Sequence, residues 1–179
     1  TAMRLDPKLF EAPYFYGRAC MAEGRFADAA RLFERAMALR PEDYQAPTFL
    51  AASLKALGKT EESLATRRLA MKIISERLEL NPDDGRALTL GATNSSKLGD
   101  VERALEYAER TLAVDPDDPM LLYNVSCVYA VLGKTDLALD SIESAVDRGL
   151  GHKAWIDHDS DLDSIRLHPR FQKVVEAVS

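Results

Sequence analysis

Small side chains recur along the chain at the spacing of paired helices. One series places a small residue near the middle of each predicted first helix, and it consists of Gly17, Ala51, Ala92 and Ser126. A second series marks the predicted second helices, and it consists of Ala29, Ser63, Ala104 and Ala138. Because a small side chain at both places lets two helices approach to about 8–10 Å, the pattern predicts a row of helix hairpins.

Glycine and proline punctuate the same pattern. Gaps of 34, 41 and 34 residues separate both the glycines Gly24, Gly58, Gly99 and Gly133 and the prolines Pro7, Pro41, Pro82 and Pro116. Each of these glycines is expected to end a first helix in the left-handed conformation. The expected helix-capping residues are Asp43, Asp84 and Asp118 for first helices and Thr60, Asp100 and Thr135 for second helices. A period near 34 residues predicts a stacked-helix solenoid.

This pattern resembles the tetratricopeptide repeat (TPR). The first unit carries the family's small residue, glycine, alanine, large apolar residue, alanine and proline as Gly17, Gly24, Ala29, Phe33, Ala36 and Pro41. The fourth unit matches at Tyr129, Gly133, Ala138, Ile142 and Ala145, but it lacks the closing proline. The third departs at Ala108 and Thr111. The resemblance implies an all-α fold, a right-handed superhelical solenoid of antiparallel hairpins with C-terminal capping helices.

The repeats are expected to occupy residues 10–43, 44–84, 85–118 and 119–151. Residues 1–9 resemble the last turn of a preceding repeat, because residues 2–7 parallel residues 36–41, so the natural protein is expected to continue upstream. A chance N-terminal tail is the alternative. Residues 152–179 break the pattern and are expected to cap the array, with Trp155 in the cap. The side chains expected to cover the fourth hairpin are Leu162, Ile165, Phe171, Val174 and Val175.

The second repeat is seven residues too long, and the excess lies between Ser63 and Pro82. Seven residues turn a helix by about 700°, close to two full turns, so an extended helix keeps its buried face. We therefore predict one helix over Glu61–Leu80. A looped-out bulge is the alternative.

Charge and cysteine content narrow the class of protein. The net charge is −6 with acidic and basic residues interspersed, which disfavours binding to nucleic acid or to an anionic membrane. Cys20 and Cys127 lie three repeats apart, so free thiols and a cytoplasmic location are expected. No apolar run approaches the roughly 20 residues of a membrane span.

An acidic stretch, Asp157–Asp163, is the strongest candidate for chemistry. Its alternating aspartates are similar to a calcium loop, but Leu162 and His168 stand where glycine and glutamate are needed. We therefore expect Asp161 to cap a short helix, with the other aspartates solvated. No motif of a catalytic nucleophile, metal site or phosphate loop is present in the sequence, so we expect no catalytic residue and no cofactor.

The TPR resemblance implies that the first helices line a concave groove that meets the partner. The residues it assigns to that groove are Tyr14, Arg18, Thr48, Lys55, Arg86, Thr89, Thr93, Lys97, Tyr123 and Asn124. Four of them are cationic, which favours an acidic or C-terminal peptide segment as the ligand. A merely solvated surface is the alternative. The carboxylate clamp of chaperone-binding TPR proteins is disfavoured. It needs one lysine and two asparagines, and this chain has Tyr14, Arg18 and Phe49 at those positions.

The C-terminal tail contains a sequence like DxDLxxLRxxPRF, which begins at Asp159 and ends at Phe171. It resembles the ending of bacterial TPR regions that follow an adenylate cyclase, a Ser/Thr kinase or a TolB-like regulator. This resemblance implies a non-catalytic protein-interaction module, the C-terminal scaffolding or sensory part of a larger bacterial signalling protein. One alternative is the regulatory region of a nucleotide cyclase or protein kinase whose catalytic domain lies upstream. Another is a self-association module that forms a homo-oligomer through its repeat faces.

Overall fold

The computed structural model describes residues 9–151 and 153–178, and every regular element within these ranges is helical. Residues 1–8, on which the expected remnant of a preceding repeat falls, lie outside the described residues, as does the side chain of Trp155. The chain divides into two compact units, one ending at Arg77 and the other beginning at Leu78.

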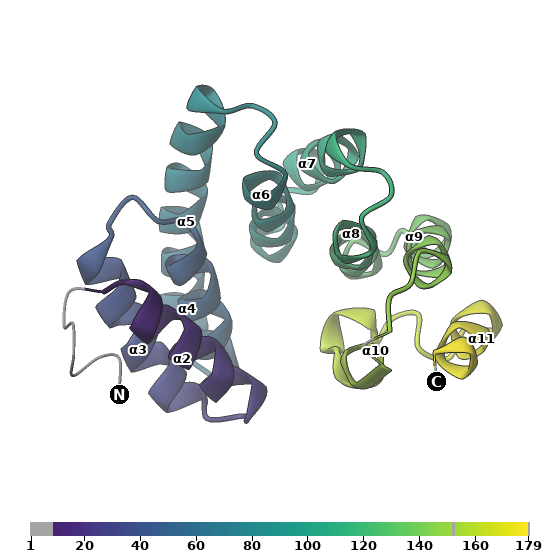
Figure 1. The fold of residues 1–179 in the computed structure, drawn as a ribbon, viewed down its shortest axis with the longest axis horizontal. Helices are drawn as coiled ribbons and strands as arrows, with labels where there is room; N and C mark the ends of the chain where they lie inside the picture. The colour runs from purple at the N-terminus through teal and green to yellow at the C-terminus, as the bar shows by residue number, and fades with distance from the viewer. Residues whose placement is uncertain (1–8, 152, 179) are drawn as a thin grey trace. The chain divides into compact units, whose positions relative to one another are not determined.

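The first unit contains α2 (Glu11–Ala22), α3 (Phe26–Leu39), α4 (Gln45–Ala56) and most of α5 (Thr60–Leu80). Helix α3 packs against both α2 and α4 (Figure 1). The ring of Phe33 is fully buried where α2 crosses α3. A Cβ atom on Gly17 would stand 2.9 Å from Cε1 of that ring, so the small residue expected at this crossing is required there.

The four periodic glycines all adopt the left-handed backbone, with φ of 73°, 77°, 79° and 70°. In each hairpin the amide after the glycine donates to the carbonyl five residues earlier, as Arg25 does to Cys20 at 2.8 Å and Lys134 does to Tyr129 at 2.8 Å. This bond closes the first helix and reverses the chain. The predicted turns are therefore confirmed.

Helix capping follows the prediction at the aspartates but not at the threonines. Asp84, Asp100 and Asp118 accept hydrogen bonds from backbone amides at the start of α6, α7 and α8. Thr60 and Thr135 are already the first helical residues of α5 and α9, and the N-cap of α9 is Lys134. The prediction that Thr135 caps α9 is wrong. The backbone hydrogen bond that closes each glycine turn places the residue directly after the glycine at the N-cap of the second helix.

Helix α5 is one continuous helix of 21 residues. Its buried positions recur at helical spacing along one face, at Ser63, Arg67, Ala70 and Ile74. The hydroxyl of Ser63 donates to the carbonyl of Ala51 in α4 at 2.6 Å, so the two backbones approach closely where small residues were expected. The helix prediction for residues 61–80 is confirmed, without a bulge.

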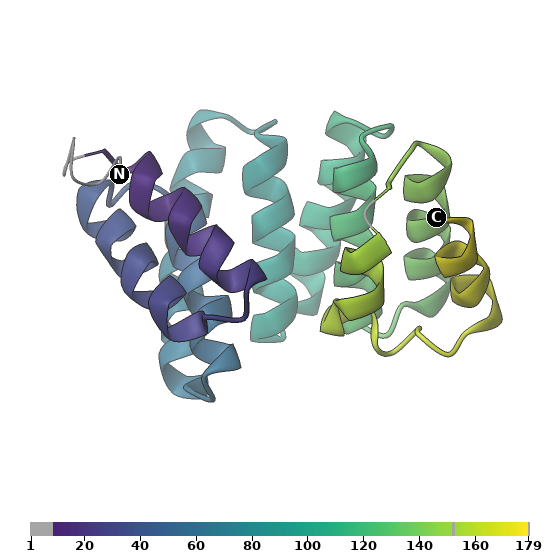
Figure 2. The same ribbon diagram turned by 60° about the horizontal axis from the view of Figure 1, so that its bottom comes forward.

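The second unit contains α6 (Gly85–Leu98), α7 (Val101–Val114), α8 (Pro119–Val131), α9 (Thr135–Asp147), α10 (Lys153–His158), the 3₁₀ turn η1 (Ser160–Leu162) and α11 (Pro169–Ala177). Helix α8 packs against α6, α7 and α9. The chain then returns so that η1 lies against α8 and α11 lies against α9. Figure 1 shows α10 and α11 beside these two helices, and Figure 2 shows α10 in front of α8.

The expected capping side chains are buried as predicted. Leu162, Ile165, Phe171 and Val174 are buried, and Val175 is half-buried.

The hydroxyl of Ser126 in α8 donates to the carbonyl of Ala138 in α9 at 2.8 Å. This bond joins the same two small-residue positions as the bond between Ser63 and Ala51, with the donor on the opposite helix.

Candidate functional site

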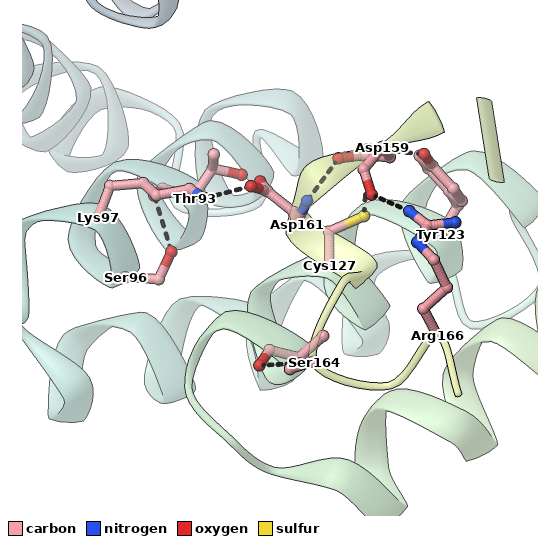
Figure 3. Close-up of polar contacts among 10 residues, drawn as sticks. Thr93, Ser96, Lys97, Tyr123, Cys127, Asp159, Asp161, Ser164 and Arg166 are labelled. Atoms are coloured by element: carbon pink, nitrogen blue, oxygen red, sulfur yellow. Dashed lines mark hydrogen bonds and ion pairs between the residues drawn. The ribbon is translucent and has the colours of Figure 1, made fainter. Parts of the chain in front are cut away.

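A cluster of polar side chains joins α6 and α8 to residues 156–166, which we name the C-terminal segment (Figure 3). The hydroxyl of Tyr123 donates to Oδ2 of Asp159 at 2.7 Å, and the thiol of Cys127 lies 3.7 Å from the same oxygen. The ammonium group of Lys97 forms an ion pair with Asp161. Two carboxylates that are two residues apart, Asp159 and Asp161, therefore contact the neighbouring first helices α8 and α6.

The C-terminal segment is also held in shape by its own hydrogen bonds. The other oxygen of Asp159 accepts from the amide of Asp161 at 2.9 Å. The guanidinium of Arg166 donates to the carbonyls of Ile156, Asp157 and Asp159 at 3.2, 2.8 and 2.7 Å. Asp159 thus caps η1, and the prediction that Asp161 caps a short helix is wrong, because its carboxylate is drawn to Lys97.

Burial of apolar side chains contributes most of the free energy that holds the C-terminal segment in place. Ile156, Leu162 and Ile165 are almost completely buried. Burying each such side chain contributes about 1.5–3 kcal/mol, whereas a partly exposed ion pair contributes about 0–1 kcal/mol. The polar contacts therefore fix the register of the segment, and the apolar contacts hold it on α8.

Burial controls the protonation of the two donors to Asp159. Burial raises the pKa of the Tyr123 hydroxyl, and the nearby Cys127 and Asp159 raise it further. The pKa of the Cys127 thiol is also raised well above its usual value, first by burial and then by Asp159 and Asp161. Both groups therefore keep their protons at neutral pH and act as donors, and Cys127 is a poor nucleophile.

A different cluster, with more aromatic side chains, lies on α2, α3 and α4 in the first unit. The ring of Phe49 stacks on Phe33 with centroids 5.7 Å apart and meets Tyr14 edge-on at 6.0 Å. The guanidinium carbon of Arg18 lies 5.3 Å from the centroid of Phe49. Arg18 and Lys55 are both exposed, and neither forms an ion pair with any of the described carboxylates.

The structure distributes the expected groove residues among four environments. Arg18 and Lys55 are exposed, whereas Arg86 and Thr93 are half-buried. Lys97 and Tyr123 contact the C-terminal segment. The remaining side chains bond within the protein: Tyr14 donates to Gln45 at 3.1 Å, and Thr48, Thr89 and Asn124 donate to backbone carbonyls four residues earlier.

Sequence reasoning missed the partner of Tyr123 and Lys97. Asp159 and Asp161 lie beyond the last periodic unit, so the 34-residue pattern carries no information about where they fold. The available signal was the alternation of aspartates beside apolar residues that were expected to cover the fourth hairpin. A cap that buries Leu162 against α8 must bring its neighbouring carboxylates to the same surface.

The described residues offer little support for other kinds of site. No group of three or more His, Cys, Asp or Glu side chains among them is placed to hold a metal ion. No helix in the described part of the chain has the length and apolar character of a membrane span. A depression of about 270 Å³ lies between α9 and α11, but Arg170 on its wall is paired with Glu143 at 2.6 Å.

Comparisons with known proteins agree with this architecture. Protein STIP1 homolog from Dictyostelium discoideum is 30% identical over 123 residues, which is 68% of this chain and 21% of that protein. The chain therefore spans about a fifth of that relative's length. TTC0263, a thermophilic TPR protein of Thermus thermophilus, has a TM-score of 0.63 and 22% identity, covering 94% of this chain and 91% of that one.

Two further solved structures share the fold. The Cut9-Hcn1 assembly of APC/C has a TM-score of 0.63 and 16% identity, over 98% of this chain and 33% of that chain. YrrB, described as a TPR protein with an unusual peptide-binding site, has a TM-score of 0.50 and 13% identity, over 99% and 88%. At these identities the likeness concerns the fold alone.

Family models complete the assignment. Two models, each described as a tetratricopeptide repeat, match residues 20–93 and 92–151. Together they cover the helices from the end of α2 through α9, including the four left-handed glycine turns. Periodic sequence, paired helices and family models coincide on the same residues, and the chain belongs to the tetratricopeptide-repeat family.

Proposed function

We propose that this protein-interaction module binds a carboxylate-bearing peptide segment of a protein partner, acidic or C-terminal, on its first helices. The observation that carries the proposal is the pair of exposed cations, Arg18 and Lys55, that have no carboxylate partner among the described residues. By contrast, Arg25 and Arg31 on the same unit are already paired with Asp28. An unpaired cation on a first helix is available to a ligand.

The packing of Arg18 suits it to this role. The ring of Phe49 lies beneath the guanidinium and restricts its movement, so less side-chain entropy is lost when a ligand binds. The planar guanidinium can then donate two parallel hydrogen bonds to one carboxylate. YrrB, whose described peptide-binding site belongs to the same fold, gives a precedent for peptide recognition by such an array.

An array of acidic peptides with free or amidated C-termini tests this proposal. The chain is expected to bind a subset of the acidic peptides, and the double variant Arg18→Ala/Lys55→Ala should weaken that binding at least about tenfold. The matched control is Arg31→Ala/Lys59→Ala, which removes the same charge from exposed positions elsewhere on the unit. Equal losses in both double variants would show only a general charge effect and would contradict the proposal.

We also propose that another helix hairpin packs on α2 in the whole protein. Phe15 stands 34 residues before Phe49, yet it is 60% exposed, whereas Phe49 is packed against the preceding hairpin. Replacing Phe15 with alanine should change the unfolding free energy of the 179-residue chain by less than about 0.5 kcal/mol. The same change should cost about 3–5 kcal/mol in the protein expressed from its full natural gene. Equal costs in the two proteins would contradict the added hairpin.

A proposal about the larger protein is supported by the sequence resemblance of the C-terminal tail to TPR regions of bacterial cyclases, kinases and TolB-like regulators. We propose that the chain is the C-terminal scaffolding or sensory part of a cytoplasmic bacterial signalling protein, and that it is not itself catalytic. Reading the natural gene tests this directly. A coding sequence without any signalling domain upstream would contradict it.

A further inference from the structure

The surface formed by α6 and α8 carries donors that match the C-terminal segment in both number and spacing. Tyr123 and Cys127, one helical turn apart on α8, point to the same oxygen of Asp159. Lys97, on the neighbouring helix α6, reaches Asp161 (Figure 3). The hydroxyl of Ser164 donates to the carbonyl of Ala130 at 2.9 Å, farther along α8.

We propose that this surface is a recognition site for an acidic turn of the pattern Asp-x-Asp-Leu, with the chain's own C-terminal segment as its resident ligand. A protein partner that carries the same turn competes for the site. This inference rests on the proposed function in one respect: it too assigns recognition of an acidic segment to the first helices, at a second place on them.

The two aspartates are recognised differently, which gives the site its selectivity. Asp159 uses one oxygen for Tyr123 and Cys127 and the other for the amide of Asp161, so an asparagine there would present its NH₂ group to one of these donors. Asp161 meets a cation whose side chain is 27% exposed. Leu162, in the turn η1 that lies against α8, is fully buried. The pattern therefore combines two carboxylates with one apolar anchor.

The tether makes the resident ligand a strong competitor. A segment joined to its site by a short connection acts at an effective concentration on the order of millimolar. A free peptide of equal intrinsic affinity at about 10 µM would then occupy roughly one site in a hundred. Weakening the polar contacts of the resident segment raises that fraction, because the empty site is populated more often.

The test uses the full chain and a fluorescein-labelled peptide with the sequence of residues 156–166, followed by fluorescence anisotropy. The wild-type chain should show almost no binding at about 10 µM. The variant Asp159→Asn/Asp161→Asn should bind the peptide at least about tenfold more tightly than the wild type. Adding Lys97→Ala and Tyr123→Phe to that variant should remove the gain. The matched control is Asp83→Asn/Asp136→Asn, which changes two exposed carboxylates elsewhere in the unit.

Three results would overturn the inference. The first is equal binding by the wild type and Asp159→Asn/Asp161→Asn. The second is the absence of binding by that variant while circular dichroism shows it to be folded. The third is a gain that survives the Lys97 and Tyr123 changes. Binding of other acidic peptides through Arg18 and Lys55 would persist in each case, so failure here is separable from failure of the proposed function.

A second measurement covers the case in which the variant does not fold. In the wild-type chain the amides of Asp161 and Leu162 both donate to Asp159 within the resident segment. Millimolar unlabelled peptide should displace that segment in a ¹⁵N-labelled wild-type chain and raise the hydrogen-exchange rates of the segment's own amides several-fold, with the amides of the first unit unchanged as the internal control. Identical rates with and without peptide would overturn the inference.

Discussion

Two tyrosines occupy the same position in two of the proposed repeats, and they meet different partners. Tyr14 is the fifth residue of repeat 10–43, and its hydroxyl bonds to the amide oxygen of Gln45 on the next first helix at 3.1 Å. Tyr123 is the fifth residue of repeat 119–151, and its hydroxyl bonds to the carboxylate of Asp159 at 2.7 Å. Tyr123 therefore joins α8 to the C-terminal segment in the way that Tyr14 joins α2 to α4.

The difference between the two partners is one of charge. Inside the array a neutral amide accepts the tyrosine hydroxyl, so the contact joins one repeat to the next without adding charge. At the end of the array a carboxylate accepts it, which strengthens the bond and adds a second attachment through Asp161 and Lys97. The same repeat position thus serves stacking in one unit and recognition of an acidic segment in the other.

The largest expected effect comes from removing the apolar anchor of the C-terminal segment. Leu162→Ala should lower the unfolding free energy of the second unit by about 2–5 kcal/mol, because the buried side chain leaves a cavity. Denaturant unfolding measures this loss. The matched control is Leu167→Ala, since Leu167 is 90% exposed and its loss should be nearly neutral. Similar effects of the two changes would show that the segment does not pack on α8.

The next effect sharpens the contrast between the tyrosines themselves. Tyr123→Phe removes a bond to a charged acceptor and should cost about 1.5–3 kcal/mol, whereas Tyr14→Phe removes a neutral bond and should cost about 0.5–1.5 kcal/mol. Both hydroxyl groups belong to buried side chains, so the measurements are comparable. A larger cost at Tyr14 would reverse the interpretation of the two contacts.

A smaller effect is expected where the two units are alike. Ser63→Ala and Ser126→Ala each remove one hydroxyl bond between the two helices of a hairpin, and each should cost about 0.5–1.5 kcal/mol. Equal costs would show that the two units differ in the contacts of Tyr14 and Tyr123 and not in the bonds within their hairpins. Unequal costs, well outside the error of denaturant unfolding, would contradict that equivalence.

The smallest effect concerns pH at the contact between α9 and α11. Hydrogen bonding to Arg170 lowers the pKa of Glu143 below its usual value of 4.5. The stabilisation is therefore fully present above about pH 4.5 and is lost as the pH falls through the lower, folded-state pKa. Thermal unfolding of the wild type and Glu143→Gln should differ at neutral pH and converge in acid. A difference that grows in acid would have the wrong sign.

The sequence predicted those parts of the fold that repeat. The positive φ at Gly24 and Gly133, the close approach at Ala138 and the unbroken helix through Ile74 all follow from local rules applied at a 34-residue period. The continuous helix of the second repeat, which is seven residues longer than the period, was also predictable, because two added helical turns preserve the buried face.

The candidate site was less predictable because its contacts are not periodic. Tyr123 and Asp159 are 36 residues apart and belong to different kinds of structure, so no repeat position links them. The burial of Thr48 and Thr89 was also missed, since a threonine in a helix can turn its hydroxyl back to its own backbone. Family positions therefore locate a side chain on a helix without revealing its partner.

Amide hydrogen exchange of residues 159–162 tests most directly whether the C-terminal segment occupies the α6–α8 surface. In the wild-type chain these amides should be protected, because the amides of Asp161 and Leu162 both donate to Asp159. Lys97→Ala/Tyr123→Phe should raise their exchange rates at least about tenfold, and Arg18→Ala should leave them unchanged. Exchange at the rate of an unstructured peptide in the wild-type chain would contradict the account.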